Sequence, residues 1–351
     1  MTLGQIDKNM LVDKNISPDV EWFDARDKDK FSVHGVFFEE ESGEWLRLPS
    51  AVAKAASRGV ERLARHMAGG RICFQTDSPY LAIHCKINGS VMSNMSWSGI
   101  GSFDMYVDGG FKGLFRSVPT GDQTVLVYQV RCCGDEKVHQ VELNLPLYAG
   151  VQDLFIGVRE GSTLLAAHPY KDIDPIVYYG SSITQGGCAS RPSTCYESYI
   201  CRDTLVDYVN LGFSGSGKGE PAIRGYIASL ACSILVLDWD HNLGSDEELR
   251  EVHEPMYRAF RAIHSDTPII FISRPDFYGS PMNKAMRQVI IDTYEKALSE
   301  GDKNVYFIDG ETIFGDEHRW ECTVDGCHPN DLGFYRFYRT LSPMIEKLLN
   351  K

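Results

Sequence analysis

Apolar residues follow two different patterns in the two halves of the chain. In the first half, seven short segments rich in β-branched and aromatic residues are separated by turn residues, as is typical of strands. They are Arg71–Gln75, Tyr80–Ile87, Phe103–Val107, Phe111–Val118, Thr124–Val130, Val138–Leu145 and Asp153–Val158. Asp108 and Gly109 predict a tight hairpin, because this pair readily adopts positive φ. The spacing predicts an all-β, jelly-roll-like sandwich.

From Pro175 onward, continuous apolar runs alternate with amphipathic segments. The predicted strands are Ile176–Gly180, Tyr208–Gly212, Ile234–Asp238, Pro268–Ser273 and Val305–Asp309, and the clearest predicted helices are Glu247–Ser265, Pro281–Glu300 and Asp331–Leu349. This alternation predicts an α/β fold with a parallel sheet covered on both faces. A charged, proline-containing stretch at Tyr170–Pro175 predicts domains of residues 1–172 and 173–351. Residues Ala51–His66 have a helix-forming composition, but their state stays open.

Length and charge narrow the class of protein. The chain has 351 residues, more than the ~250–300 residues that one hydrophobic core usually holds, so two domains are expected. A net charge of −13 argues against a nucleic-acid partner. No run of 18 apolar residues is present, so no membrane span is expected, and the N-terminus lacks the apolar core of a signal peptide. We therefore expect a cytoplasmic protein, or a periplasmic or secreted one whose leader has been removed.

The ten cysteines are scattered, without a C-x-x-C pair or zinc-finger spacing. Several lie inside apolar runs, which favours buried, reduced thiols. Cys188 and Cys195 flank a loop, and the sequence leaves open whether they pair.

The stretch Ile176–Gly186 carries the first candidate for chemistry. An apolar run leads into Gly180, and the hydroxyl residues Ser181, Ser182 and Thr184 follow it. Open α/β sheets place their reactive groups at the carboxyl ends of strands. A serine at this glycine-assisted turn is a candidate nucleophile, and the alternative is a turn built from small residues.

The segment Asp325–Gly333 supplies a candidate acid–base pair. Asp325 and His328 are three residues apart, and Pro329 and Asn330 precede a helix. A carboxylate on Nδ1 of a histidine fixes its tautomer and stabilises the imidazolium formed during proton transfer. The alternative is a helix-capping loop with an incidental histidine. Asp309 is a second candidate for the acid, whereas a nucleophilic Cys327 is disfavoured because adjacent side chains in a loop usually diverge.

Two further strand ends carry candidate hydrogen-bond donors. Glycines follow the second strand of the α/β half, where a backbone N–H can approach a ligand, and Asn242 follows the third strand. A backbone N–H and an asparagine amide are the parts of an oxyanion hole. Asp238, Asp240 and His241 also suit a metal, but no matching ligand set lies elsewhere, so no metal or cofactor is expected.

Taken in order, these residues resemble the SGNH hydrolase superfamily, the GDSL-type esterases, over residues from about 174 to 350. Gly180–Thr184 matches the first block, so the resemblance makes Ser182 the nucleophile. It assigns Gly215 to the second block, Asn242 to the third, and Asp325 and His328 to the fifth. It implies a flavodoxin-like sheet of strand order 2-1-3-4-5 and an oxyanion hole of Ser182, Gly215 and Asn242.

The first half resembles the β-sandwich that precedes this domain in one bacterial branch, where Gly150–Phe155 is a loose version of a G-x-D-L-Y stretch. Two departures stand out. In the first block, Ser181 replaces the acidic residue. In the third block, Asp240 and Leu243 stand in place of the glycine and the aspartate. His241 is therefore an alternative to Asn242 as the donor.

These features predict a serine esterase that hydrolyses small acyl, above all acetyl, esters, plausibly of carbohydrates, through an acyl-enzyme on Ser182. Trp239 and Trp320 flank the site loops and suit sugar rings, although a tryptophan is more often packing. A lysophospholipase or thioesterase, and a non-catalytic carbohydrate-binding protein, remain as alternatives. The expected partner is a small-molecule or carbohydrate ester, and the sequence does not indicate an oligomeric state.

Overall fold

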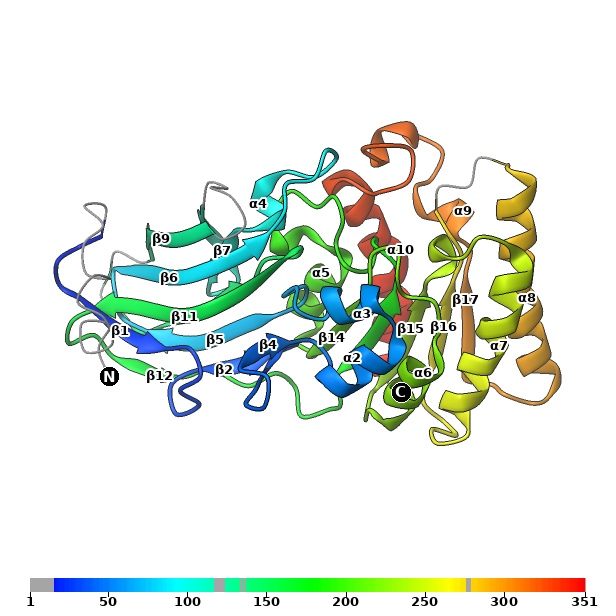
Figure 1. Cartoon of the computed structure of the whole chain (residues 1–351), viewed down its shortest axis with the longest axis horizontal. Coiled ribbons are helices and arrows are strands. Elements are labelled where there is room, and N and C mark those ends of the chain that lie inside the picture. Colours follow the sequence, from blue (N-terminus) through cyan, green and yellow to red (C-terminus); the bar gives the residue numbers. More distant parts are fainter. Residues whose placement is uncertain (1–15, 117–123, 133–134, 136, 276–278, 351) are drawn as a thin grey trace. The chain divides into compact units, whose positions relative to one another are not determined.

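The computed structural model describes residues 16–116, 124–132, 135, 137–275 and 279–350, drawn as a cartoon in Figure 1. Residues 1–15, and the last two residues of the predicted strand Phe111–Val118, lie outside these ranges. Backbone contacts divide the chain into two compact units. The first is Met1–Arg47, Arg65–Tyr170 and Ser190–Ser193, and the second is Leu48–Ala64, Lys171–Ala189 and Thr194–Lys351.

The first unit is a β-sandwich with antiparallel pairing. One sheet has the order β1-β11-β6-β9, and the other has the order β12-β5-β10-β7-β8 with β2 also paired to β5. The strands are β1 (Val20–Asp24), β2 (Ser32–His34), β5 (Arg71–Thr76), β6 (Tyr80–Gly89), β7 (Phe103–Val107), β8 (Gly110–Phe115), β9 (Thr124–Arg131), β10 (His139–Asn144), β11 (Ala149–Arg159) and β12 (Leu164–Ala166), with a separate hairpin of β3 (Phe37–Glu39) and β4 (Glu44–Leu46) and a short helix α4 (Trp97–Ile100). All seven predicted strands are present.

The two sheets share one core, because alternate residues of each strand point inward. Ile72 and Phe74 of β5 lie in the same buried cluster as Leu81 and Ile83 of β6. The G-x-D-L-Y-like stretch forms an irregularity in β11, where the register shifts between Gln152 and Phe155. The sandwich predicted for the first half is therefore confirmed.

The second unit contains a five-stranded parallel sheet of order β14-β13-β15-β16-β17. Its strands are β13 (Ile176–Gly180), β14 (Tyr208–Gly212), β15 (Ile234–Asp238), β16 (Ile269–Ile272) and β17 (Val305–Ile308). Its helices are α2 (Ser50–Ala56), α3 (Arg58–Leu63), α5 (Tyr196–Thr204), α6 (Pro221–Ser229), α7 (Asp246–Arg261), α8 (Pro281–Ser299), α9 (Gly310–Ile313) and α10 (Asp331–Leu349), with 3-10 turns η3 (Asp240–Asn242) and η4 (Trp320–Cys322). Numbered along the chain, the strand order is 2-1-3-4-5, as predicted.

Helices cover both faces of this sheet, because neighbouring strand residues point in opposite directions. Tyr178 packs edge-on against Tyr196 of α5, which in turn stacks on Phe337 of α10. Tyr179 lies in the other cluster, with buried residues of α6, α7 and α8. β13 is buried along its whole length between these layers.

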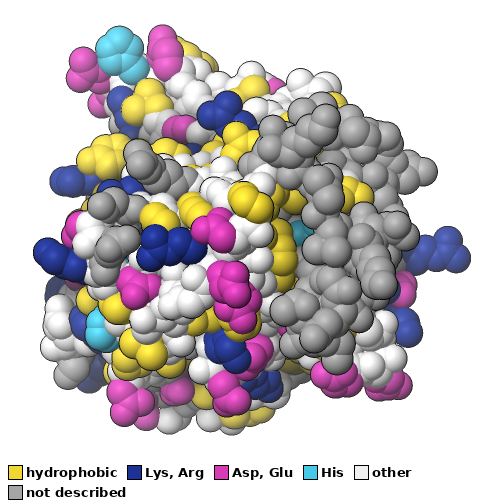
Figure 2. Space-filling view, turned by 90° about the vertical axis from the view of Figure 1, so that its left-hand side faces the viewer, with side chains coloured by type: hydrophobic (Ala, Val, Ile, Leu, Met, Phe, Trp, Pro, Cys, Tyr) yellow, Lys and Arg dark blue, Asp and Glu magenta, His cyan; other side chains and the backbone are white. Residues whose placement is uncertain are grey.

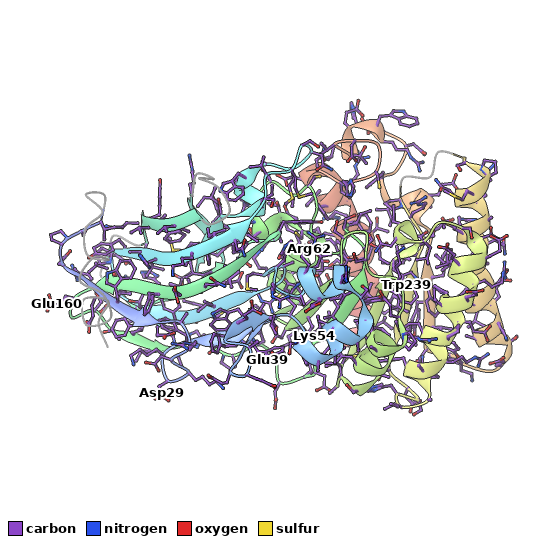
Figure 3. The ribbon with its side chains drawn as sticks, in the orientation of Figure 1. Asp29, Glu39, Lys54, Arg62, Glu160 and Trp239 are labelled. Atoms are coloured by element: carbon purple, nitrogen blue, oxygen red, sulfur yellow. The ribbon has the colours of Figure 1, made fainter. Side chains whose placement is uncertain are left out.

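Residues Ala51–His66, whose state the sequence leaves open, form α2 and α3. Ala53 and Val60 are buried in the cluster that also contains Tyr179, whereas Lys54 and Arg62, labelled in Figure 3, are exposed. These helices come from the first half of the sequence but belong to the second unit. Their apolar side chains complete the core on the α6 side of the parallel sheet.

Among the described residues, no helix is long and apolar enough to cross a membrane. On the face drawn in Figure 2, acidic and basic side chains are interspersed with apolar ones.

Candidate active site

The turn that follows β13 holds Ser182 at the carboxyl end of a central strand. Gly180 allows this turn, since a Cβ there would lie 1.9 Å from Thr184 Oγ1 and 2.3 Å from the Asp238 carbonyl oxygen. The Ser181 N–H donates to that same carbonyl over 2.9 Å. The Ser181 hydroxyl accepts from the Ile183 N–H over 3.2 Å, so its role is to shape the turn. Of the two adjacent serines, Ser182 is the one that reaches a histidine.

Ser182, His328 and Asp325 form one hydrogen-bonded row. Ser182 Oγ lies 2.9 Å from His328 Nε2. His328 Nδ1 lies 2.8 Å from Asp325 Oδ2. The other carboxylate oxygen, Oδ1, accepts from the backbone N–H of His328 over 2.9 Å and of Cys327 over 3.1 Å. Asp325 therefore fixes both the ring and the backbone of His328, which leaves Nε2 directed at the hydroxyl.

The loop that carries this pair is closed at both ends. Thr323 and Pro329 form an isolated antiparallel bridge, and the Val324 N–H donates to the His328 carbonyl over 2.9 Å. Asn330 then caps α10, accepting from the Gly333 N–H over 3.1 Å. The segment from Asp325 to His328 thus forms a hydrogen-bonded turn, and the residues that follow it begin α10.

The second candidate acid, Asp309, is engaged elsewhere. Its Oδ1 accepts from Arg287 Nε over 2.8 Å. This hydrogen bond from the guanidinium lowers the pKa of the Asp309 carboxyl despite its partial burial. Asp325, and not Asp309, is the carboxylate that contacts His328.

Gly215 lies at the tip of the loop after β14. Its φ is +65°, a conformation that favours glycine, and a Cβ there would meet open space. Its N–H donates to no acceptor within the described part of the chain. Gly215 is exposed, so this N–H can reach a ligand.

Asn242, in η3 after β15, lies against the same loop. Its Nδ2 donates to the Phe213 carbonyl over 3.1 Å and to the Gly217 carbonyl over 3.0 Å. An asparagine amide has two donors. Both are therefore directed at the loop that carries Gly215.

The two tryptophans named from the sequence have opposite environments. Trp239, labelled in Figure 3, is only 1% exposed and packs edge-on against Tyr179 with ring centroids 4.7 Å apart. It is enclosed in the core and presents no face to a ligand. Trp320 in η4 is 69% exposed, so its ring is accessible.

Asp238, Asp240 and His241 have candidate ligand atoms within 4.8 Å of one another. However, the two aspartates also accept hydrogen bonds from residues that follow neighbouring strands of the sheet. Asp240 Oδ2 accepts from the Arg274 N–H over 3.0 Å, and its Oδ1 lies 3.2 Å from His241 Nδ1. Asp238 Oδ2 accepts from Thr184 Oγ1 over 3.3 Å. One oxygen of each aspartate is thus bonded within the scaffold of strand ends.

Cys188 and Cys195 are both buried and free in the structure. Burial, and to a smaller extent the negative charge of Asp325, raise the pKa of the Cys188 thiol to about 12. Such a thiol is protonated and a poor nucleophile.

Sequence reasoning missed three buried residues beneath this site. Gln185 is fully buried, and its Oε1 accepts from the Ser214 N–H over 2.9 Å. Asn210 donates to the Thr184 carbonyl over 2.5 Å and to Glu197 Oε1 over 3.3 Å. Burial raises the pKa of Glu197 well above its usual range, so its carboxyl is held neutral. In the sequence, each of the three is recognisable only as a polar residue within an apolar stretch. Such a pattern does not show which residue it bonds to.

Comparison with known proteins assigns a family to both halves of the chain. Residues 173–346 match the profile of the GDSL-like Lipase/Acylhydrolase family. Residues 20–164 match the N-terminus of Esterase_SGNH_hydro-type proteins, named GxDLY. No curated protein gives a significant match.

Solved structures extend the likeness over both units. A protein from Bacteroides ovatus assigned as a GDSL-like lipase is 30% identical, with a TM-score of 0.82 over 94% of this chain and 98% of its own. The salicylyl-acyltransferase SsfX3 from a tetracycline biosynthetic pathway is 22% identical, with a TM-score of 0.79 over 95% and 98%. A family two carbohydrate esterase from Clostridium thermocellum, solved with cellohexaose, is 14% identical, with a TM-score of 0.64 over 91% and 99%. At these lower identities the last two show the fold alone. The chain belongs to the GDSL-like lipase/acylhydrolase family of SGNH-type esterases and is an enzyme that acts on ester bonds.

Proposed function

We propose that this chain hydrolyses small acyl esters, acetyl esters of carbohydrates in particular, through an acyl-enzyme on Ser182. The observation that carries the proposal is the row from Ser182 Oγ to His328 Nε2, 2.9 Å, and from His328 Nδ1 to Asp325, 2.8 Å. A hydroxyl, an imidazole and a carboxylate at these distances are what nucleophilic catalysis by serine requires. The fold shared with a carbohydrate esterase supports the choice of alcohol.

In the first half-reaction, His328 Nε2 accepts the proton of Ser182 while Oγ attacks the ester carbonyl carbon. Asp325 stabilises the imidazolium that forms. The N–H groups of Ser182 and Gly215 donate to the oxyanion. Asn242 is the third proposed donor, and it would exchange one of its bonds to the loop carbonyls for one to the oxyanion. The tetrahedral intermediate then collapses, and His328 gives its proton to the departing alcohol.

In the second half-reaction, water attacks the acyl group on Ser182 while His328 takes the water proton. The same donors hold the new oxyanion. Collapse releases the carboxylic acid and returns the proton to Ser182 Oγ, so no cofactor is consumed.

The test is hydrolysis of p-nitrophenyl acetate by the wild type, Ser182→Ala and Ser181→Ala. We expect Ser182→Ala to lower kcat by about 10⁴-fold or more, because it removes the attacking oxygen. Ser181→Ala is the matched control at the adjacent serine and should stay within about tenfold of the wild type, since its hydroxyl serves only one bond in the turn. Equal rates for wild type and Ser182→Ala would contradict the proposal.

A panel of acetylated sugars and acyl esters of increasing chain length tests the substrate class. Higher kcat/KM on acetylated sugars than on long-chain esters supports the proposal. A preference for long acyl chains would favour a lysophospholipase or thioesterase instead. Tight glycan binding without turnover of any ester would favour the carbohydrate-binding alternative.

A further inference from the structure

The loop Phe213–Gly217 is held from two sides by side-chain amides, of which Gln185 is buried and Asn242 half-buried. On one side, Gln185 Oε1 accepts from the Ser214 N–H over 2.9 Å. On the other side, Asn242 Nδ2 donates to the carbonyls of Phe213 and Gly217 over 3.1 and 3.0 Å. Within the described chain, Gly215 at the centre of the loop is the residue whose N–H stays unused. The hydrogen bonds from Gln185 and Asn242 thus hold the residues on both sides of the proposed oxyanion donor.

Gln185 also belongs to the turn that carries the nucleophile. It is three residues after Ser182, and its own N–H donates to the Ser181 carbonyl over 3.1 Å. The end of β14 packs so closely against Gln185 that a Cβ on Gly212 would lie 2.2 Å from the Gln185 backbone nitrogen. One fully buried residue therefore connects the serine turn to the loop of the second block.

We propose that Gln185 is a positioning residue, whose carboxamide sets the direction of the Gly215 N–H relative to Ser182. This proposal rests on the proposed function, because it assigns Gly215 as an oxyanion donor. The bond to the Ser214 N–H fixes the peptide plane one step before Gly215. The bonds from Asn242 hold the carbonyls on either side of it, and one of them remains when the other is exchanged for a bond to the oxyanion. With these planes fixed, the positive φ of Gly215 determines where its N–H points.

Loss of the Gln185 acceptor leaves the Ser214 N–H without its buried partner, so the loop turns to find another acceptor. A shift of about 1 Å in a catalytic group can cost about 100-fold in rate. Such a shift acts on the transition state, where charge develops on the oxyanion, and has little effect on substrate in the ground state. The expected signature is therefore a fall in kcat at nearly constant KM.

The experiment measures kcat, KM and their pH dependence for p-nitrophenyl acetate hydrolysis in Gln185→Met and Gln185→Glu. Methionine matches the length of glutamine but accepts no comparable hydrogen bond, whereas glutamate keeps an acceptor oxygen at the same reach. Gln288→Met, on the exposed side of α8, is the control for the same chemical change elsewhere. Thermal melts report whether each variant is folded, and Gln185→Asn, with a shorter reach, replaces Gln185→Met if the latter does not fold.

We expect Gln185→Met to lower kcat by about 10–100-fold with KM within about twofold. The pH profile should keep its midpoint, because the contact of His328 with Asp325 is untouched. Gln185→Glu should recover most of the lost kcat, and Gln288→Met should match the wild type. An unchanged kcat in folded Gln185→Met, or a loss that appears only in KM, would overturn the positioning role. Wild-type activity in Ser182→Ala would instead overturn the proposed function itself, so the two failures are distinguishable.

Discussion

The imidazoles of His328 and His139 both lie against aspartates, but their second ring nitrogens face different partners. His328 Nδ1 contacts Asp325 over 2.8 Å, and its Nε2 contacts the Ser182 hydroxyl over 2.9 Å. His139 on β10 has Asp108 2.5 Å from Nδ1 and Asp135 2.7 Å from Nε2. One ring has a hydroxyl to activate, whereas the other is enclosed by two acceptors.

This difference decides what each histidine can do. Hydrogen bonds to Asp108 and then Asp135 raise the pKa of His139, because two carboxylates favour the imidazolium. Because both of its ring nitrogens lie against carboxylates, His139 has no nitrogen left to take a proton from a reacting group, and it links the β7–β8 turn to β10. His328 keeps one nitrogen for proton transfer. An Asp–His pair thus indicates catalysis only when the remaining nitrogen reaches a group that reacts.

The strongest contrast should come from removing each ring. His328→Ala deletes the proposed base, so we expect kcat for p-nitrophenyl acetate to fall by about 10³–10⁵-fold. His139→Ala removes only a surface link and should leave kcat within about twofold of the wild type. Steady-state rates of the two purified variants make the comparison. A large loss in His139→Ala, with its fold intact, would contradict the assignment of roles.

The two aspartates provide a smaller contrast. Asp325→Asn keeps the size of the side chain but removes the charge that stabilises the imidazolium, and its amide favours the wrong tautomer of His328. We expect a loss of about 10²–10⁴-fold in kcat/KM. Asp108→Asn, the same change beside His139, should leave kcat/KM unaltered. Similar rates for Asp325→Asn and the wild type would mean that another group orients His328.

The smallest effect concerns stability and pH. The pKa of His139 is higher in the folded protein than in the unfolded chain. Its contacts with the two aspartates therefore add their full stabilisation to the fold at pH values below the ordinary histidine pKa. This stabilisation is lost as the pH rises through the raised pKa of the folded protein. The two aspartates are about half exposed, so solvent screens the effect. His139→Gln should therefore lower Tm by a few degrees or less at acidic pH and by still less at alkaline pH. Thermal melts from mildly acidic to alkaline pH measure this, and a difference that grows with pH would show that the sign is wrong.

Much of the second unit is predictable from the sequence because its strands and proposed site residues are marked by patterns within short segments. Each strand of the parallel sheet is an apolar run, interrupted in β14 by Asn210. The proposed site residues follow strand ends or lie three apart, as Asp325 and His328 do. The strand order 2-1-3-4-5 came from family resemblance and is confirmed by the pairing of β13 with β14 and β15.

What the sequence did not reveal depends on contacts between distant segments. β1 and β12 are short strands that pair with β11 and β5, far along the chain, and have no pattern of their own. The helices of Leu48–Ala64 belong to the second unit because their apolar faces complete its core. Gln185 is similar, since only the fold reveals that its carboxamide meets Ser214.

The central claim is that Ser182 carries the acyl group, and direct capture of that intermediate is its most decisive test. The enzyme is mixed with p-nitrophenyl acetate, quenched with acid during the first turnover, digested and analysed by mass spectrometry. The account predicts one acetyl group on the peptide containing Ser182, none in Ser182→Ala, and much slower labelling in His328→Ala. Acetate release at the wild-type rate with no acetyl group on Ser182, or labelling at another residue, would contradict it.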